Sequence, residues 1–246
     1  MCELFGLSSS DPLTGRNTPL DTFRLRGGAT ADNPDGWGMA WLGESGFDVV
    51  KEPLPGSHSA RFEHAIEALR SDLVIAHVRK ANFPPINTLN NTHPFLRACC
   101  GRQWAFAHNG LVPEIVAMET GNQKRVCRPD GETDSEFAFC HLLSHVTQHF
   151  DEGGTATDWL AVLGTVSGLI AERGKFNFLL SDGDYLIAYG HDRLHYLESS
   201  GETDDVVLIA TEPLSGNAGW TPFAPGELRI YRAGRIASHA PAHAHG

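Results

Sequence analysis

The chain has 246 residues, of which 41% are hydrophobic and 20% are charged, values that are ordinary for a globular protein with a sizeable core. Its formal net charge of −11 at pH 7 argues against nucleic-acid or anionic-membrane partners, because both need a basic surface. No stretch approaches the length of a transmembrane helix, and the first residues lack the basic and apolar regions of a secretory signal, so we expect a cytoplasmic protein.

Strand-like and helix-like segments alternate along the chain. The predicted strands are, in chain order, 73–78, 104–107, a hairpin over 176–188 with its turn at 181–184, 206–210 and 228–231, with a further turn at 233–234. Apolar residues at helical spacing predict helices around 62–69, 139–150 and 160–170. Many antiparallel strands with a few amphipathic helices indicate an α+β layered fold.

The end of the chain differs in composition from the rest. Residues 238–246 alternate Ala, His and Pro, so we expect a disordered tail that follows a single domain over 1–237. The five cysteines are odd in number and form no CxxC pair, so the sequence predicts neither a disulfide framework nor a zinc ribbon. Adjacent Cys99 and Cys100 are interpreted as small loop or strand residues rather than as a redox pair.

Cys2 is the first candidate for chemistry. An aminopeptidase can remove an initiator Met that precedes a small residue, and the chain would then begin with a cysteine that carries its own α-amine. The ordinary pKa of that amine is about 7.7–8.0 and that of the thiol about 8.5, so the amine can take the thiol proton without a separate histidine. The alternative is an incidental cysteine packed in a first strand.

Arg79 ends the apolar strand that begins at Val74, and alternation along this strand puts His77 and Arg79 on one face. A guanidinium in such surroundings needs a carboxylate, either a structural Asp or Glu or a substrate carboxylate that is held bidentately. Asn109-Gly110 follows a second apolar run, where the pair is a hairpin-turn signal. The functional alternative is an oxyanion hole that is formed by the Asn109 amide and the Gly110 N–H.

Asp134 lies just before an amphipathic helix. Thr133 and Glu136 match a capping box, which places Asp134 at the first helical position, where an acid is favourable to the helix dipole. The alternative is a fixed anion that binds a substrate ammonium group. A three-histidine metal site from His77, His93 and His108 is conceivable, but their spacing is not typical of ligands, so we expect neither a metal nor a cofactor.

Six segments in this order resemble the class-II glutamine amidotransferases, a family of N-terminal-nucleophile hydrolases. They are Met1–Gly6, Arg26–Gly28 with Asp35–Gly38, Ala76–Arg79, Asn91–Phe95, His108–Gly110 and Gly131–Glu136. The resemblance implies a four-layer α-β-β-α sandwich of two antiparallel sheets. It also implies roles: Cys2 attacks the γ-carbonyl, Asn109 and Gly110 stabilise the oxyanion, and Arg79 and Asp134 bind the carboxylate and ammonium of a γ-glutamyl substrate.

Two departures from the family pattern bear on function. The synthase-fused enzymes typically carry Trp, Thr and His after the arginine, whereas this chain has Lys80-Ala81-Asn82-Phe83, and its length leaves no room for a synthase domain. The resemblance is therefore greatest to the small stand-alone members, some of which act on γ-glutamyl compounds other than glutamine. Three hypotheses stay open: an amidohydrolase that acts alone, a glutaminase subunit that serves a synthase or peptidase partner, and a non-catalytic γ-glutamyl-binding module.

Overall fold

The computed structural model describes residues 1–82, 85–151, 153, 159–200, 205–214 and 219–240. The strands of this part form a seven-stranded and a six-stranded sheet, and every pairing between strands is antiparallel. The first sheet has the order β11 (Thr221–Pro222), β9 (His195–Ser200), β10 (Asp205–Ala210), β1 (Glu3–Thr14), β4 (Arg70–Val78), β2 (Trp37–Gly43), β3 (Gly46–Glu52). The second has the order β13 (Arg235–Ala240), β12 (Glu227–Arg232), β8 (Leu186–Gly190), β7 (Lys175–Ser181), β6 (Arg102–Leu111), β5 (Phe95–Cys99).

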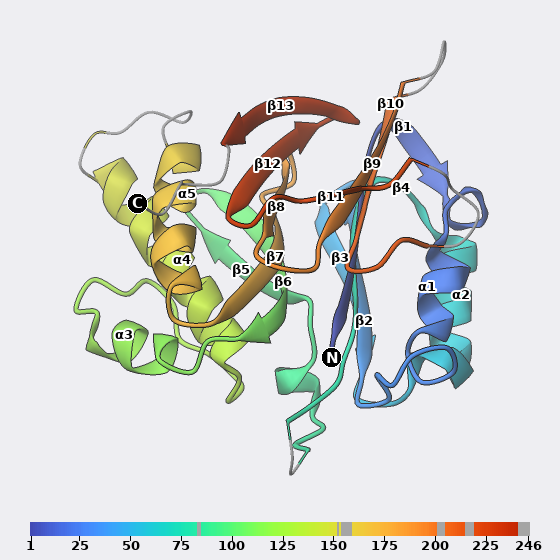
Figure 1. The fold of residues 1–246 in the computed structure, drawn as a ribbon, viewed down its shortest axis with the longest axis horizontal. Coiled ribbons are helices and arrows are strands. Elements are labelled where there is room, and N and C mark those ends of the chain that lie inside the picture. Colours follow the sequence, from blue (N-terminus) through green and yellow to red (C-terminus); the bar gives the residue numbers. More distant parts are fainter. Residues whose placement is uncertain (83–84, 152, 154–158, 201–204, 215–218, 241–246) are drawn as a thin grey trace.

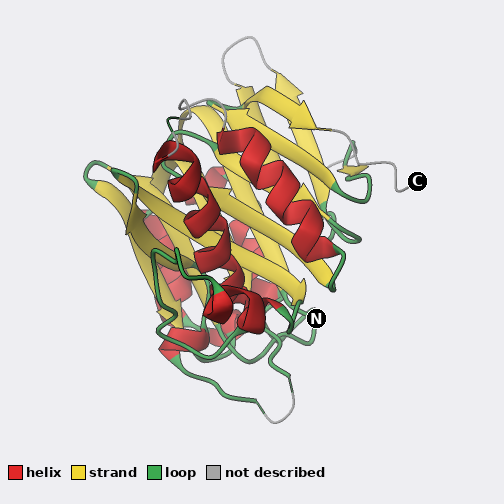
Figure 2. Ribbon diagram, turned by 90° about the vertical axis from the view of Figure 1, so that its left-hand side faces the viewer, coloured by secondary structure: helices red, strands yellow, loops and turns green. Residues whose placement is uncertain are grey.

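Helices cover the outer faces of the two sheets (Figure 1). On one side lie α1 (Leu20–Leu25) and α2 (Ala60–Ala68), and on the other α3 (Ile115–Gly121), α4 (Asp134–Asp151) and α5 (Trp159–Ala171). Figure 2 shows the long helices lying side by side across the face of a sheet. The arrangement confirms the predicted four-layer sandwich.

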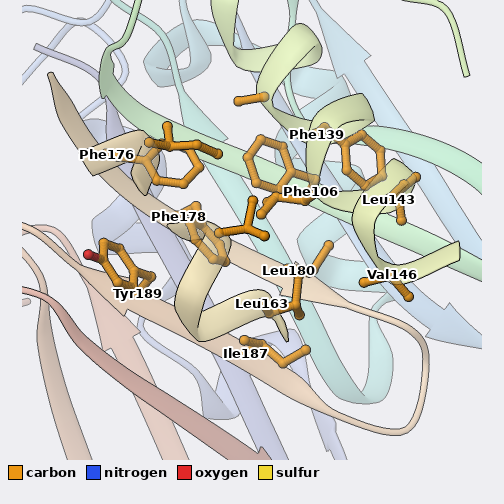
Figure 3. Close-up of a cluster of buried hydrophobic side chains, with 14 of the residues drawn as sticks. Phe106, Phe139, Leu143, Val146, Leu163, Phe176, Phe178, Leu180, Ile187 and Tyr189 are labelled. Atoms are coloured by element: carbon orange, nitrogen blue, oxygen red, sulfur yellow. The ribbon is translucent and has the colours of Figure 1, made fainter. Parts of the chain in front are cut away.

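Three clusters of apolar side chains lie between the four layers of sheets and helices. Each cluster removes from water the apolar faces of the two layers that it joins. The aromatic and aliphatic side chains between α4, α5 and the six-stranded sheet include Phe106, Phe139, Phe178 and Leu163 (Figure 3). Phe106 stacks on Phe139 with ring centroids 5.0 Å apart. Equivalent clusters fill the space between the sheets and the space beneath α1 and α2.

The middle of strand β4, residues 73–76, is a continuous apolar run, and its surroundings explain why. Its side chains at 74, 76 and 78 face α1 and α2, and those at 73 and 75 face the other sheet. A strand that is buried on both faces has no reason to alternate with polar residues. The predicted placement of His77 on the face opposite Ala76 is confirmed, and that face is the interior between the two sheets.

Most of the predicted elements are confirmed. Each predicted strand lies within an observed one, the turn of the 176–188 hairpin falls between β7 and β8, and the predicted helices correspond to α2, α4 and α5. The turn at Ala233-Gly234 joins β12 to β13, with both residues at positive φ.

Two predictions from composition were wrong. Ser238, His239 and Ala240 pair with β12 as part of β13, so the expected tail boundary at 237 falls inside a strand; residues 241–246 lie outside the described residues. Cys127 and Cys140 form a disulfide that ties the segment before α4 to that helix. This pair could not be predicted from the sequence, because twelve residues lie between the two cysteines and neither belongs to a recognisable motif.

Cys99 and Cys100 lie where the structural interpretation expected them. Cys99 ends β5 and Cys100 begins the turn to β6, and each sulfur lies within hydrogen-bond distance of the Thr147 hydroxyl, at 3.1 and 3.0 Å. Over the described ranges, no helix combines the length and the apolar character that a bilayer crossing needs.

Candidate active site

Cys2 lies immediately before β1, and its sulfur rests against the main chain of Lys80. The thiol donates to the Lys80 carbonyl oxygen at 3.3 Å and accepts from the Lys80 amide at 3.2 Å. Burial raises the pKa of the Cys2 thiol above its ordinary value. In the full chain the α-amine belongs to Met1, so Cys2 acquires an amine of its own only when Met1 is removed.

A buried carboxylate fixes the strand that carries this cysteine. Glu3 is 4% exposed and forms an ion pair with Arg26, in which Nη2 of Arg26 lies 3.0 Å from Oε1 of Glu3. The Asn33 amide donates to the same oxygen at 3.3 Å. Because a buried carboxylate is stable only when it is paired and hydrogen-bonded, Arg26 and Asn33 determine where β1 begins. The Arg26–Gly28 segment thus contributes to the candidate site indirectly, through the ion pair of Arg26 with Glu3.

Arg79 follows the last residue of β4 and is 7% exposed. Its guanidinium donates to Oδ1 of Asn87 at 2.9 Å and approaches the carbonyl oxygen of Asp35 at 3.5 Å. Within the part of the chain that the structure describes, it forms no ion pair with a carboxylate, so the structural pairing with an Asp or Glu was wrong. Burial lowers the pKa of Arg79, which marks a cation that is short of solvation.

Asp35 holds the loop that surrounds this guanidinium. Its carboxylate accepts from the Ala81 amide at 2.9 Å and from the Asn87 side chain at 3.3 Å. The main chain of Arg79 forms two hydrogen bonds with this loop. Its amide donates to the Gly36 carbonyl oxygen, and its carbonyl oxygen accepts from the Asp35 amide. Phe83, which belongs to the segment where this chain departs from the family pattern, lies outside the described residues.

Asn109 and Gly110 lie within β6 and not in a turn, so the hairpin interpretation was wrong. Pairing with β7 continues through both residues to Leu111, with Asn109 opposite Asn177. Asn109 is fully buried, and its Nδ2 donates to the Thr211 hydroxyl at 3.2 Å. That hydroxyl also accepts from the Leu4 amide at 2.9 Å, which links Asn109 to the strand that begins after Cys2.

The side-chain amide of Asn109 has hydrogen-bonding capacity to spare. An Asn amide has two N–H donors, and Thr211 takes one of them. Its Oδ1 atom is buried and has no partner within the described residues. The second Nδ2 hydrogen is thus the donor that a bound substrate oxygen could accept from, whereas Oδ1 is an acceptor and a substrate oxygen would leave it without a partner.

Gly110 is required by the close approach of β7. A Cβ atom at this position would lie 1.8 Å from the Lys175 carbonyl oxygen and 2.7 Å from Nε2 of His108. No side chain fits there without a shift of the backbone. The glycine therefore keeps the strand beside Asn109 straight and close to its neighbour.

Asp134 is the first residue of α4, as the capping pattern predicted. One carboxylate oxygen accepts from the Val112 amide at 2.6 Å, and the other accepts from the Ser135 amide at 2.9 Å. These bonds join the start of α4 to the end of β6, two residues beyond Gly110. The helix-start interpretation of Asp134 is thus confirmed, and the role in substrate binding stays a prediction.

The predicted capping box forms only in part. The Thr133 hydroxyl accepts from the Glu136 amide at 3.3 Å, as expected. The Glu136 carboxylate instead accepts from the amides of Asp130 and Gly131, at 3.0 and 2.8 Å, and forms an ion pair with Arg97. Glu136 is 1% exposed, so it fixes the Gly131 loop from inside.

The Asn91 side chain brings two of the sequence motifs into contact. Its Oδ1 atom accepts from the Glu132 amide at 2.9 Å. A Cβ atom at Gly131 would lie 2.5 Å from this same oxygen, so only glycine allows the contact. The segment from Asn91 to Phe95 and the segment before Asp134 are therefore in direct contact.

The three histidines lie inside the molecule. The rings of His77 and His93 have centroids 4.2 Å apart, and their four ring nitrogens have no partner within the described residues. His108 contacts the Ser135 hydroxyl through Nδ1 at 2.9 Å. Burial lowers the pKa of His77 to about 3 and that of His93 well below its ordinary value. Across the described residues, no three His, Cys, Asp or Glu side chains group as metal ligands would.

Sequence reasoning missed two residues that hold the candidate site together. Thr211 joins Asn109 to β1, and Asn177, 2% exposed, donates to the Asn109 carbonyl oxygen at 3.1 Å. Thr211 stands at the end of an apolar strand and shows no distinguishing pattern. Asn177 does, because an amide between two phenylalanines of a buried strand must find a specific partner.

The fold, in which two antiparallel sheets lie between layers of helices, is the one that the resemblance predicted, and comparison with known proteins agrees. The sequence model of the family described as glutamine amidotransferases class-II matches residues 1–200 and 197–245. The chain belongs to this family.

Relatives match along most of the chain. YafJ of Escherichia coli K12, which carries a provisional glutamine amidotransferase name, is 37% identical over 95% of this chain and 98% of its own. A predicted glutamine amidotransferase from Pseudomonas aeruginosa PA01 has a crystal structure with a TM-score of 0.72 at 32% identity, over 96% of this chain and 100% of that one.

Two more distant relatives are informative. The γ-glutamyl-hercynylcysteine sulfoxide hydrolase of Mycobacterium tuberculosis H37Rv is 27% identical over 76% of this chain and 71% of its own. The glutamine PRPP amidotransferase of B. subtilis has a TM-score of 0.70 at 17% identity, over 98% of this chain and 49% of that one, which shows that the fold is shared.

Proposed function

We propose that this protein is an amidohydrolase that cleaves the γ-glutamyl amide of glutamine or of a γ-glutamyl metabolite, with Cys2 as the nucleophile once Met1 has been removed. The observation that carries the proposal is that the Cys2 sulfur lies next to Arg79 in the chain's fold, because it contacts the main chain of Lys80, the residue after Arg79. The Arg79 guanidinium is buried and has no carboxylate partner in the described chain. The substrate α-carboxylate would supply the missing charge.

The chemistry needs a base, because burial raises the pKa of the thiol and so disfavours the thiolate. The α-amine of a chain that begins at Cys2 is close enough to take the thiol proton. The sulfur then bonds to the carbon of the γ-carbonyl, the C–N bond of the amide breaks, and the leaving amine takes up that proton. Water adds to the resulting thioester, which releases glutamate and restores the thiol. Asn109 and Gly110 would stabilise the negative oxygen of both tetrahedral intermediates.

Asp134 would bind the substrate ammonium group at the edge of the same site. The similarity to a γ-glutamyl-hercynylcysteine sulfoxide hydrolase supports a γ-glutamyl substrate with a leaving group larger than ammonia. A cytoplasmic location and the absence of a cofactor belong to the same proposal.

The test is a screen of the mature enzyme for glutamate release from glutamine and from γ-glutamyl peptides. We expect release from at least one of them, and none from Cys2→Ser protein that keeps its thermal melting behaviour, because a hydroxyl is a far poorer nucleophile near neutral pH. Equal rates for both proteins would refute the assignment of Cys2. Activity on glutamine alone that appears only with an added synthase would favour the glutaminase-subunit hypothesis.

A further inference from the structure

A second arginine lies beside the start of the chain. Nη1 of Arg193 lies 3.6 Å from the sulfur of Met1, and Nη2 forms an ion pair with Glu212. The Arg193 side chain is 30% exposed and that of Glu212 is 37% exposed. Arg193 therefore borders solvent at the position that Met1 occupies, next to Cys2.

The loop that carries Arg193 is fixed to the candidate oxyanion strand. Oδ1 of Asn177 accepts from the amides of His191, Asp192 and Arg193, at 2.8, 3.0 and 3.4 Å. Nδ2 of the same side chain donates to the Asn109 carbonyl oxygen and to Asp192. One buried amide thus ties the turn between β8 and β9 to Asn109.

The partner of Arg193 is fixed from the other side. Glu212 directly follows Thr211, whose hydroxyl accepts from the Asn109 amide and from the Leu4 amide. Arg193 and Glu212 are thus both attached to residues that contact Asn109. A side chain that is held by two such supports presents its charge at a defined place, which a surface arginine on a free loop does not.

The two arginines approach Cys2 from different elements. Arg79 comes from the end of β4, and its neighbour Lys80 contacts the Cys2 sulfur, whereas Arg193 comes from the β8–β9 turn and contacts Met1. A γ-glutamyl amide with its carbonyl carbon at the sulfur has its glutamyl head on one side and its leaving amine on the other. With Arg79 on the glutamyl carboxylate, Arg193 is available for the leaving group.

We propose that Arg193 is a specificity-determining residue that binds a carboxylate on the leaving amine, so that the substrate class is the γ-glutamyl amino acids and γ-glutamyl peptides; this inference rests on the proposed function. Removal of Met1 uncovers Nη1. A guanidinium has five N–H donors, so Arg193 can keep its bond to Glu212 while it donates to a second carboxylate.

The experiment compares two substrates that share the γ-amide and differ in the leaving group, γ-glutamylglycine and γ-glutamylethylamide. The mature wild-type enzyme should have the higher kcat/KM on γ-glutamylglycine. Arg193→Met should lower the ratio of the two kcat/KM values about tenfold or more, mainly through the KM of γ-glutamylglycine, as expected for loss of a hydrogen bond to a charged group. Arg193→Lys should give an intermediate ratio.

Arg235→Met is the matched control, because Arg235 also forms an ion pair with a carboxylate, that of Asp205, but is the first residue of β13, an edge strand of the six-stranded sheet. It should leave the ratio at the wild-type value. A wild-type enzyme that hydrolyses both substrates equally well overturns the inference and leaves the proposed function standing, as does an unchanged ratio in folded Arg193→Met. Glutamate release from neither substrate, nor from glutamine, overturns the proposed function and this inference with it.

Discussion

Arg79 carries a charge that nothing in the described chain neutralises by direct contact. Its bond to Asn87 and its approach to a carbonyl oxygen leave most of its donors for a ligand. Arg79→Lys should therefore raise KM about tenfold or more for substrates with a free α-carboxylate, because lysine keeps the charge but loses the bidentate fork. Steady-state kinetics on glutamine or a γ-glutamyl peptide measure the effect, and an unchanged KM would make Arg79 structural.

Asn109 should act mainly on the transition state, since the tetrahedral intermediate carries a negative oxygen that the ground-state amide lacks. Asn109→Ala should lower kcat by about 10²–10³ with a smaller change in KM. Asn109→Asp should be at least as damaging, because it places a carboxylate against the developing charge. Thermal melts beside active-site-titrated kinetics separate catalysis from stability. A wild-type kcat in folded Asn109→Ala protein would leave the residue with a role in packing only.

At the scale of the elements, Thr211 joins β10, β1 and β6 through one hydroxyl. Thr211→Val keeps the shape but leaves the buried Leu4 amide without its acceptor, so the free energy of unfolding should fall by about 1–3 kcal/mol. It also frees the Asn109 amide, so kcat should fall as well. Thr211→Ser retains the hydroxyl and should recover most of both losses in urea titrations and kinetics. A valine variant as stable and as active as wild type would contradict the assigned link.

The elements also show what the sequence could and could not predict. The buried strands β4 and β6 and the helices α4 and α5 were predictable, because apolar runs and helical periodicity depend on local sequence. The Asn109-Gly110 turn was mispredicted because the local turn signal was overridden by pairing with β7, which is distant in sequence. The Cys127–Cys140 bond and the β12–β13 pairing depend on contacts of the same non-local kind.

For the candidate site, the individual residues could be predicted from the sequence, but the contacts that join them could not. Cys2, Arg79, Asn109, Gly110 and Asp134 were named from motifs, and the structure shows which main-chain and side-chain groups surround each of them. The connections among them, through Glu3, Thr211 and Asn177, were not foreseen, because each joins residues from different sheets or distant segments. The sequence around Asn177 indicates that its amide needs a partner, but a single sequence does not identify which residue that partner is.

At the scale of the whole molecule, the buried histidines make stability depend on pH. The folded-state pKa of His77 is about 3, below its ordinary value of 6.5, so the native protein binds fewer protons than the unfolded chain between these values. Stability is therefore full above about pH 6.5 and is lost as pH falls toward 3. At pH 5 this histidine alone should cost about 2 kcal/mol relative to pH 7.

Urea titrations at pH 7 and pH 5 test this dependence. His77→Leu should show a smaller loss of unfolding free energy between the two pH values than wild type, even if its stability at pH 7 is lower. His239→Leu is the control, because His239 is a partly exposed residue of β13 and lies away from the buried group. Identical losses in wild type and His77→Leu would show that His77 is not held neutral by burial.

The role proposed for Cys2, freed from Met1, is that of the nucleophile toward γ-glutamyl compounds. Its most direct test is to treat the purified protein with a glutamine-like diazoketone and to locate the adduct by intact-mass and peptide mass spectrometry. We expect a chain that lacks Met1, one adduct on Cys2, none on Cys99 or Cys100, and loss of activity in proportion to labelling. A fully active protein that retains Met1, or inactivation with the adduct on Cys99 or Cys100, would contradict the account.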